Sequence, residues 1–304
     1  MVGIGLFLVP ITIDGKQTIA IGLLSDLLRQ WSAEWLPYLL AIIFSVSGIV
    51  SSYATLFRPS WIMGRPLLKH LFFTSFVWLS LRVTGAIMCS LTVFGVGPEW
   101  IIGESTGAVA YIEMASIIFC IMLVANFLLP FLTDYGFLEF VGTLLTRPFQ
   151  ILFNLPGRAG LDALTSWVGD SSVGTILTVR QYEEGFYSAR EAAVVVTNFS
   201  AVSLPFSVVI GQMARIDHVF FPFYFSVVFA SIVAAFITPR LPPLSRVSLK
   251  FFERADRKAE ASNEQDFIIR QAWSRALARA EHGPSAKSIV SGGSRTILDI
   301  YITV

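Results

Sequence analysis

Residues 160–210 read GLDALTSWVGDSSVGTILTVRQYEEGFYSAREAAVVVTNFSAVSLPFSVVI, and this stretch decides the fold. Acids, hydroxyls and glycines alternate there with Val, Ile and Phe, and hydrophobic segments lie on both sides. A polar group at membrane depth is costly, so a protein that places one there usually uses it, most often on the path of a solute. The stretch therefore predicts a polar pathway in a membrane protein.

The composition of the 304 residues is that of an integral membrane protein. Hydrophobic residues make up 54% of the chain and charged residues 14%, whereas soluble domains average about 25% charged residues. The net charge of +1 gives no reason to expect a nucleic-acid partner. Cys89 and Cys120 lie in apolar runs and there is no CxxC pair, so we expect neither a metal site nor a cofactor.

Five apolar windows approach the ~20 residues that a membrane-spanning helix requires. They are Leu36–Phe57, Leu71–Phe94, Ala108–Leu132, Val219–Leu241 and the more polar Ala192–Met213. Residues 1–13 are apolar but short, and we interpret them as part of a first helix. The windows predict an all-α, polytopic membrane protein, with N-terminal transmembrane helices in residues 1–133.

Residues 134–241 are predicted to form a second membrane domain of a different kind. Between residues 133 and 190 the chain has no uninterrupted apolar window, because prolines, glycines and polar residues break it up. Short interrupted pieces are typical of interfacial helices or re-entrant hairpins. We expect a re-entrant segment at about residues 160–180, with two full spans as the alternative.

The charges of the loops predict the orientation, since cytoplasmic loops are enriched in Lys and Arg. Loop 58–70 is basic and loop 95–110 is acidic, and half of the 22 Lys and Arg residues follow Pro239. The third part, residues 242–304, is therefore expected in the cytoplasm. Its segment 246–281 predicts an amphipathic helix or helical hairpin on anionic inner-leaflet lipid, or alternatively a solvated linker. Residues 297–304 are interpreted as the start of a further helix.

A break between two short helices is predicted at residues 169–172. Residues 161–168 and 173–180 have helical character, and Asp170 or Ser171 suits the N-cap of the second piece. The free N–H groups at such a break can bind a hydroxyl, a carbonyl or an anion. An ordinary loop between interfacial helices is the alternative.

The next helix is predicted to start at a capping box of Ser188 and Glu191 and to run to Met213. Thr197, Ser200 and Ser203 recur at a spacing of three and share one stripe, next to the Asn198 amide. Such groups line a pathway or hold helices together. Upstream, Arg82 and Glu113 are expected to form a structural ion pair.

The residues GLDALTSWVGDSSVGTILTVRQYEEGFYSAREAAVVVTNFSAVSLPFSVVIGQM at 160–213 resemble the nucleoside-recognition Gate domain of bacterial YjiH-like membrane proteins. The opening ITIDGKQTIAIGLLSDLL at 11–28 is similar to the N-terminus of the same group. Gate domains also occur in concentrative nucleoside transporters, ferrous iron transporters and spore maturation proteins. The resemblance implies membrane passage or gating in a bacterial inner (cytoplasmic) membrane. The residues that it places in the gate are Asp162, Asp170, Ser171, Gly174, Thr175 and Tyr182, followed by the hydroxyl stripe of the next helix.

The sequence thus favours a transporter or gate for a small polar solute, with nucleosides as one candidate, over an enzyme. It contains no Walker loop, G-x-S-x-G or HExxH motif. The candidate site residues are Asp162, Trp167, Asp170, Ser171, Ser172, Thr175, Tyr182, Asn198, Ser200 and Ser203. The alternative is a non-transporting scaffold that binds a partner protein through its basic tail, and a homo-oligomer is left open.

Overall fold

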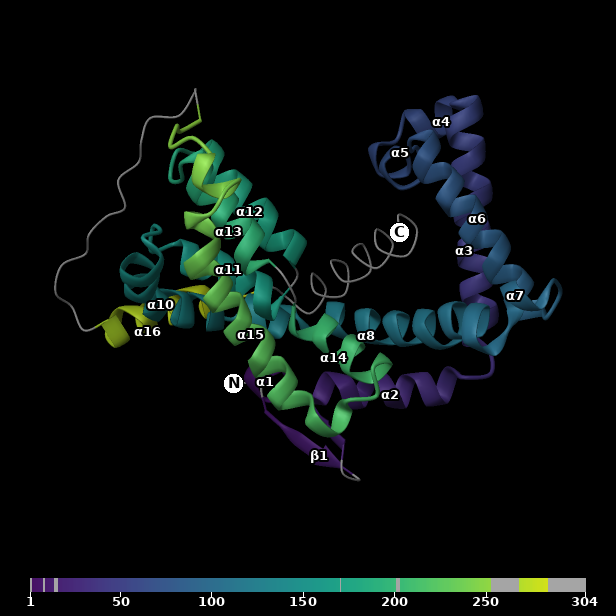
Figure 1. The fold of residues 1–304 in the computed structure, drawn as a ribbon, viewed down its shortest axis with the longest axis horizontal. Coiled ribbons are helices and arrows are strands. Elements are labelled where there is room, and N and C mark those ends of the chain that lie inside the picture. The colour runs from purple at the N-terminus through teal and green to yellow at the C-terminus, as the bar shows by residue number, and fades with distance from the viewer. Residues whose placement is uncertain are drawn as a thin grey trace. The chain divides into compact units, whose positions relative to one another are not determined.

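The computed structural model describes residues 2–7, 9–13, 16–169, 171–200, 203–252 and 268–283. It divides into two compact units, each considered by itself below. The first unit comprises the described residues of 1–21 and 128–285, and the second those of 22–127. Helices dominate both, as predicted, and the strands of the described residues form one two-stranded sheet (Figure 1).

The second unit is built around two long helices, α3 (Leu36–Phe57) and α6 (Phe76–Phe94), which pack side by side. Its other elements are α2 (Ala20–Ser32), α4 (Ser60–Met63), α5 (Pro66–Phe72), α7 (Glu99–Ile102), the π-helical η1 (Glu104–Met114) and α8 (Ala115–Leu128). The bounds of α3 are those of the predicted window. α6 starts later than predicted, because Ser75 is extended and separates it from α5.

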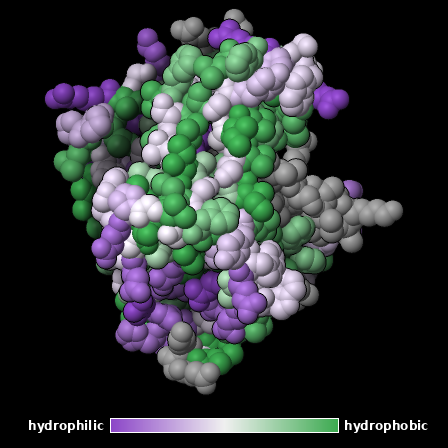
Figure 2. Space-filling model, turned by 90° about the vertical axis from the view of Figure 1, so that its right-hand side faces the viewer, coloured by the Kyte–Doolittle hydropathy of each residue, from purple (hydrophilic) through white to green (hydrophobic). Residues whose placement is uncertain are grey.

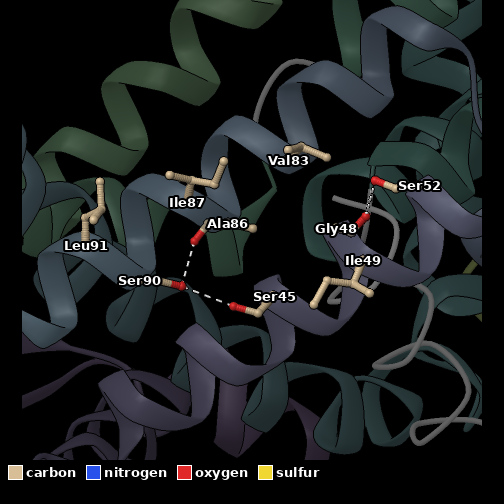
Figure 3. A pocket seen from close by; sticks show the side chains of 9 residues that line it. All are labelled: Ser45, Gly48, Ile49, Ser52, Val83, Ala86, Ile87, Ser90 and Leu91. Carbon is tan, nitrogen blue, oxygen red and sulfur yellow. Dashed lines mark hydrogen bonds between the residues drawn. The ribbon is translucent and has the colours of Figure 1, made fainter.

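A groove of about 310 Å³ lies between α3 and α6 (Figure 3). Ser45 and Ser90 face each other across it, with their hydroxyl oxygens 3.1 Å apart, and Ser90 also donates to the carbonyl of Ala86. These hydroxyls are bonded within the protein, and Ile49 and Ile87 on the rim are exposed. The groove is therefore mainly an apolar surface between two membrane helices.

Five helical stretches of the described residues are long and apolar enough to cross a membrane. They are Leu36–Phe57, Phe76–Phe94, Glu104–Thr133, Ala189–Met213 and Asp217–Arg240. Along α3, Ile42, Ile49 and Leu56 are 60%, 70% and 60% exposed, and their spacing of seven places them on one helical face. Figure 2 shows hydrophobic side chains over much of the side on which α3 and α6 lie. The protein is thus a multi-pass membrane protein with an exposed apolar stripe along α3.

Arg82 on α6 has partners that differ from the expected one. Its guanidinium donates to Ser51 Oγ and to the Leu71 carbonyl, both at 2.9 Å, whereas Glu113 is exposed. The Leu71 carbonyl lies in the last turn of α5, where helix carbonyls lack helical partners. Two neutral oxygens of neighbouring helices therefore hold this cation.

The first unit begins with α1 (Val2–Phe7), β1 (Ile11–Ile13) and β2 (Lys16–Thr18). The strands pair antiparallel, with Ile11 opposite Thr18 and Ile13 opposite Lys16. Our interpretation of residues 1–13 as one helix is thus correct only for its first half. Pro10 interrupts the helical hydrogen bonds, and the β-branched residues that follow it favour an extended chain.

The remaining helices of the first unit are α9 (Pro130–Thr133), α10 (Phe137–Phe153), α11 (Ala159–Val168), α12 (Ser171–Glu183), α13 (Ala189–Phe199), α14 (Leu204–Met213), η2 (Asp217–Val219), α15 (Phe220–Ile237), η3 (Thr238–Arg240), η4 (Leu244–Arg246) and α16 (Ile268–Glu281). The first unit also contains an apolar core, to which α10, α11, α13 and α15 of these helices contribute buried residues. The rings of Phe149 on α10 and Phe199 on α13 pack against each other within this core, with their centroids 5.0 Å apart. The core fixes the end of α13 relative to α10 and α11.

The tail helix α16 packs against α10 (Figure 1). Arg279 bridges Asp134 at 3.1 Å and Glu139 at 3.4 Å, and Trp273 meets Phe140 edge to face. Gly136 (φ +88°) permits the close approach, since a Cβ there would lie 2.2 Å from a backbone oxygen of α16. One face of the predicted amphipathic tail is thus covered by protein, and residues 253–267 and 284–304 lie outside the described residues.

Candidate functional site at two helix breaks

The first break separates α11 from α12, as the glycine and hydroxyl pattern predicted. α11 ends at Val168 with Gly169 as its C-cap, and α12 starts at Ser171. The two helices fold back on each other so closely that a Cβ on Gly174 would lie 1.8 Å from Ser166 Oγ. At 1.5 Å per residue they measure ~15 and ~20 Å, less than the ~30 Å hydrocarbon core of a bilayer.

The second break interrupts the helix that we expected to run without interruption to Met213. α13 ends at Phe199, and α14 begins at Leu204 with Ser203 in an extended conformation as its N-cap. Pro205 explains the difference, because proline lacks the N–H for a helical hydrogen bond and is tolerated only in the first turn. The second break follows the first by about thirty residues, and hydroxyls border both.

A hydrogen bond connects the two breaks. The hydroxyl oxygens of Ser166 on α11 and Ser200, which directly follows α13, lie 3.1 Å apart. Either hydroxyl can donate, and each has further capacity to accept. The structure thus brings Ser200, a predicted site residue, to the break between α11 and α12.

Asp162, another predicted site residue, is fully buried one turn before Ser166. Its Oδ2 accepts hydrogen bonds from Tyr187 OH at 2.9 Å and from Thr178 Oγ1 at 3.1 Å. The carboxyl group therefore ties α11 to α12 and to the residue before the α13 capping box. Both of these hydrogen bonds of the Asp162 carboxyl group are made within the protein.

Asn198 is 6% exposed and is also held by the protein. Its Nδ2 donates to the Val194 carbonyl at 3.0 Å, and its Oδ1 accepts from Thr238 Oγ1 at 2.5 Å. The partner that a buried amide requires is thus supplied by η3, directly after α15. Asn198 connects two helices, whereas Ser200, two residues later, points to α11.

The other predicted site residues lie around these contacts. Trp167 packs on Phe199, with ring centroids 5.8 Å apart, and Tyr182 meets Phe252 edge to face. Thr175 donates to the carbonyl of Ser171 one turn earlier. Ser203 is the α14 N-cap residue, although its side chain makes no capping bond. Asp170 and the side chain of Ser172 lie outside the described residues, so the predicted N-cap role of Asp170 stays a prediction.

The N-terminus of α13 carries the capping box that the sequence predicted. Ser188 N–H donates to Glu191 Oε2 at 2.7 Å, and Glu191 N–H donates to Ser188 Oγ at 3.3 Å. A second set of partners comes from the start of the tail. The N–H groups of Ala189 and Arg190 donate to the carbonyls of Lys250 (2.9 Å) and Ser248 (3.2 Å), which attaches residues 248–250 to α13.

Three residues at the site were not among the candidate site residues, namely Ser166, Thr178 and Tyr187. A signal for two of them was present, because Asp162 and Ser166 are four residues apart, as are Gly174 and Thr178. Each pair therefore shares one helical face. The sequence contains no comparable signal that brings Tyr187 to Asp162.

Comparison with known proteins gives one family match and one relative of this chain. Residues 115–216 match the Gate family, described as nucleoside recognition. The chain is also 38% identical over 302 residues to an uncharacterized protein of Alkalihalophilus pseudofirmus, with 99% of this chain and 65% of that protein covered. The chain thus spans about two thirds of the length of that curated relative. No solved structure significantly matches this chain.

Both helix breaks and the Ser166–Ser200 contact lie inside the matched residues. The resemblance seen in the sequence is thereby confirmed at the level of the domain, while the YjiH name rests on the resemblance alone. The chain is a multi-pass membrane protein whose residues 115–216 match the Gate family, described as nucleoside recognition.

Proposed function

We propose that this protein is a transporter or gate for a small polar solute, and that nucleosides are the first candidates for that solute. The observation that carries the proposal is the hydrogen bond between Ser166 and Ser200, which joins two interrupted helices within the Gate domain. Interrupted helices in membrane transporters place polar backbone and side-chain groups at the depth where a solute binds. A nucleoside has hydroxyl and carbonyl groups that match such partners.

The lengths of α11 and α12 support a re-entrant hairpin. Each helix is shorter than the hydrocarbon core, and neither is among the five stretches long enough to span it. A hairpin that enters and leaves on the same side keeps the cytoplasmic tail consistent with the basic loop 58–70. In this arrangement the protein lies in a bacterial cytoplasmic membrane with its tail inside, and its role is passage of a solute and not catalysis.

The contacts of the tail favour the transporter over the scaffold. Arg279 and Trp273 are used in contacts with α10 and so are not free for a partner protein. The exposed residues Ile269 and Leu277 lie eight positions apart and so on one face of α16, which is typical of a helix face that lies on lipid. We propose that this face contacts the anionic inner leaflet.

Uptake of labelled purine and pyrimidine nucleosides by proteoliposomes that contain the protein tests the function. We expect saturable uptake that decreases when Ser166→Ala and Ser200→Ala are combined. The matched control combines Ser45→Ala and Ser90→Ala, because this pair has the same 3.1 Å separation but lies outside the Gate domain. Nucleoside at a hundredfold excess over its dissociation constant should also stabilise the protein by about 2.7 kcal/mol. Equal uptake with and without the protein contradicts the proposal.

A further inference from the structure

We propose that Asp162 is a proton-binding site and that its neutral carboxyl group holds α11, α12 and the entry to α13 together. This inference goes beyond transport of a solute and can be tested without it. It starts from the burial of Asp162, which is 0% exposed. A carboxylate in such a position needs either a cation or a full set of donors.

The hydrogen bonds of Asp162 are unevenly distributed over its two oxygens. Oδ2 accepts from both Tyr187 and Thr178, whereas Oδ1 has no hydrogen-bond partner in the part of the chain that the structure describes. An ionised carboxylate shares its charge between both oxygens, so half of that charge would be buried without a donor. A neutral carboxyl leaves only a carbonyl oxygen there, and the cost of an unpaired neutral acceptor is much lower.

The Thr178 hydroxyl provides a second argument. It has one proton but two acceptors within reach, the Gly174 carbonyl at 2.9 Å and Asp162 Oδ2 at 3.1 Å. If Oδ2 carries a proton, Asp162 donates to Thr178, and Thr178 donates to Gly174. Every hydrogen then has one acceptor. Asp162 takes this proton from water and releases it to water. The equilibrium is therefore between the carboxylic acid and the carboxylate plus a proton.

The charged groups around α11 have other partners. Arg158, one turn before Asp162, donates to Gln181 Oε1 at 2.7 Å and lies 3.5 Å above the Phe186 ring, while its charge still acts on Asp162. The remaining charged side chains on helices packed against α11 are Glu139 and Arg147 of α10, Arg180 and Glu183 of α12, and Arg190 and Glu191 of α13. Glu139 pairs with Arg279, Arg180 with Glu184, Arg190 with tail carbonyls, and Glu191 with Ser188. Arg147 and Glu183 are exposed instead, and α14 has no charged residue.

Loss of the proton favours a different packing of these helices. The charge that appears on Asp162 requires water or new donors, and either can reach it only when α12 moves away from α11. Since Ser166 lies one turn further along α11, the same movement changes the surroundings of the Ser166–Ser200 contact. The site therefore links the proton concentration to the state of the helix breaks.

The expected pH dependence follows from proton binding. A free aspartate loses its proton at about pH 3.9, whereas the folded protein retains the proton on Asp162 at higher pH. Between about pH 3.9 and the higher pH at which the folded protein releases this proton, the folded state binds more protons than the unfolded state. The free energy of unfolding therefore falls as the pH rises. Asp162→Asn is neutral at every pH and lacks this contribution.

The experiment compares the unfolding temperature of the purified protein in lipid nanodiscs with that of Asp162→Asn, between about pH 5 and pH 8. We expect the unfolding temperature of the wild type to fall relative to that of Asp162→Asn as the pH rises. Infrared spectra of the wild type at about pH 5 should contain the carbonyl band of a protonated carboxyl, which should weaken as the pH rises, and Asp162→Asn should lack it. Parallel pH profiles, or a missing band, overturn the proposal.

A second variant keeps the test valid if Asp162→Asn does not fold. Tyr187→Phe removes one hydrogen bond to the carboxyl group and should shift the same infrared band, whereas Tyr111→Phe, outside this cluster, should not. A band that Tyr187→Phe leaves in place belongs to another residue and contradicts the assignment. Stabilisation by sodium ions that depends on Asp162, without the infrared band, also contradicts it, because the bound cation would then be a metal ion. Failure of nucleoside uptake leaves these results unaffected.

Discussion

The hydroxyl oxygens of Ser166, in the last turn of α11, and of Ser200, directly after α13, lie 3.1 Å apart. Their hydrogen bond connects the two helix breaks. A hydrogen bond of this kind contributes about 0.5–1.5 kcal/mol. We therefore expect the single Ala variants to be non-additive, with a coupling energy of about 1 kcal/mol in a double-mutant cycle of unfolding. Ser45 and Ser90 should show a similar coupling. A saturating nucleoside should change the first cycle and leave the second as it is, and equal changes in both would contradict binding at the breaks.

Gly174 is required for the close packing of α11 and α12. A Cβ there would lie 1.8 Å from Ser166 Oγ and 3.1 Å from the Asp162 carbonyl oxygen, so Gly174→Ala should destabilise the protein by about 1–3 kcal/mol. Gly85→Ala in α6 is the control, since nothing lies within 4 Å of its Cβ. Alanine is the better helix former, so this variant should be stabilised by about 0.5–1 kcal/mol. Thermal or denaturant unfolding measures the stability of both variants. Equal effects of the two substitutions would show that the packing does not require Gly174.

Asn198 should act through stability and not through solute affinity. Asn198→Ala removes the acceptor of Thr238 and should cost about 1–2 kcal/mol. Thr238→Val should cost at least as much, because it leaves the buried Asn198 Oδ1 without its donor, whereas in Asn198→Ala the Thr238 hydroxyl still has the Ala234 carbonyl as acceptor. The two changes together should cost less than their sum. Binding of nucleoside to the folded Asn198→Ala protein should equal that of the wild type. A large loss of affinity at unchanged stability would instead place the amide in the solute site.

Arg279 should control how firmly α16 is held on α10. Its two ion pairs, with Asp134 and Glu139, are partly exposed, so Arg279→Gln should cost only about 1 kcal/mol, and less at high salt. Hydrogen exchange of the α16 amides should become faster in this variant. Arg180→Gln is the control, because its pair with Glu184 is exposed on the surface of α12. Unchanged exchange in Arg279→Gln would mean that the contact between Trp273 and Phe140 suffices to hold the helix.

The elements that could be predicted from the sequence are those that depend on neighbours in the chain. The window Leu36–Phe57 coincides with α3 because a mainly apolar run of 22 residues without a charge has few alternatives to one helix. The capping box at Ser188 and Glu191 needs residues only three positions apart. The break at residues 169–171 follows from Gly169, whose conformational freedom ends a helix readily.

The contacts that escaped prediction join residues far apart in the chain. Arg82 binds Ser51 and Leu71 because folding brings two neutral oxygens close to it, and no periodicity in the sequence indicates that arrangement. The same is true of Asn198 with Thr238, which are separated by 40 positions. The break before Leu204 is different, since Pro205 was a local signal, and it was outweighed by the hydrophobic length of the window around it.

The attachment of residues 248–250 to the start of α13 has a mechanical consequence. At 1.5 Å per residue, the eleven residues of α13 form a rigid rod about 16 Å long. One end of this rod is bonded to the tail through Ala189 and Arg190, and the other end leads directly to Ser200. A force applied to residues 248–250 would therefore be transmitted along α13 to Ser200, at the junction of the two interrupted helices.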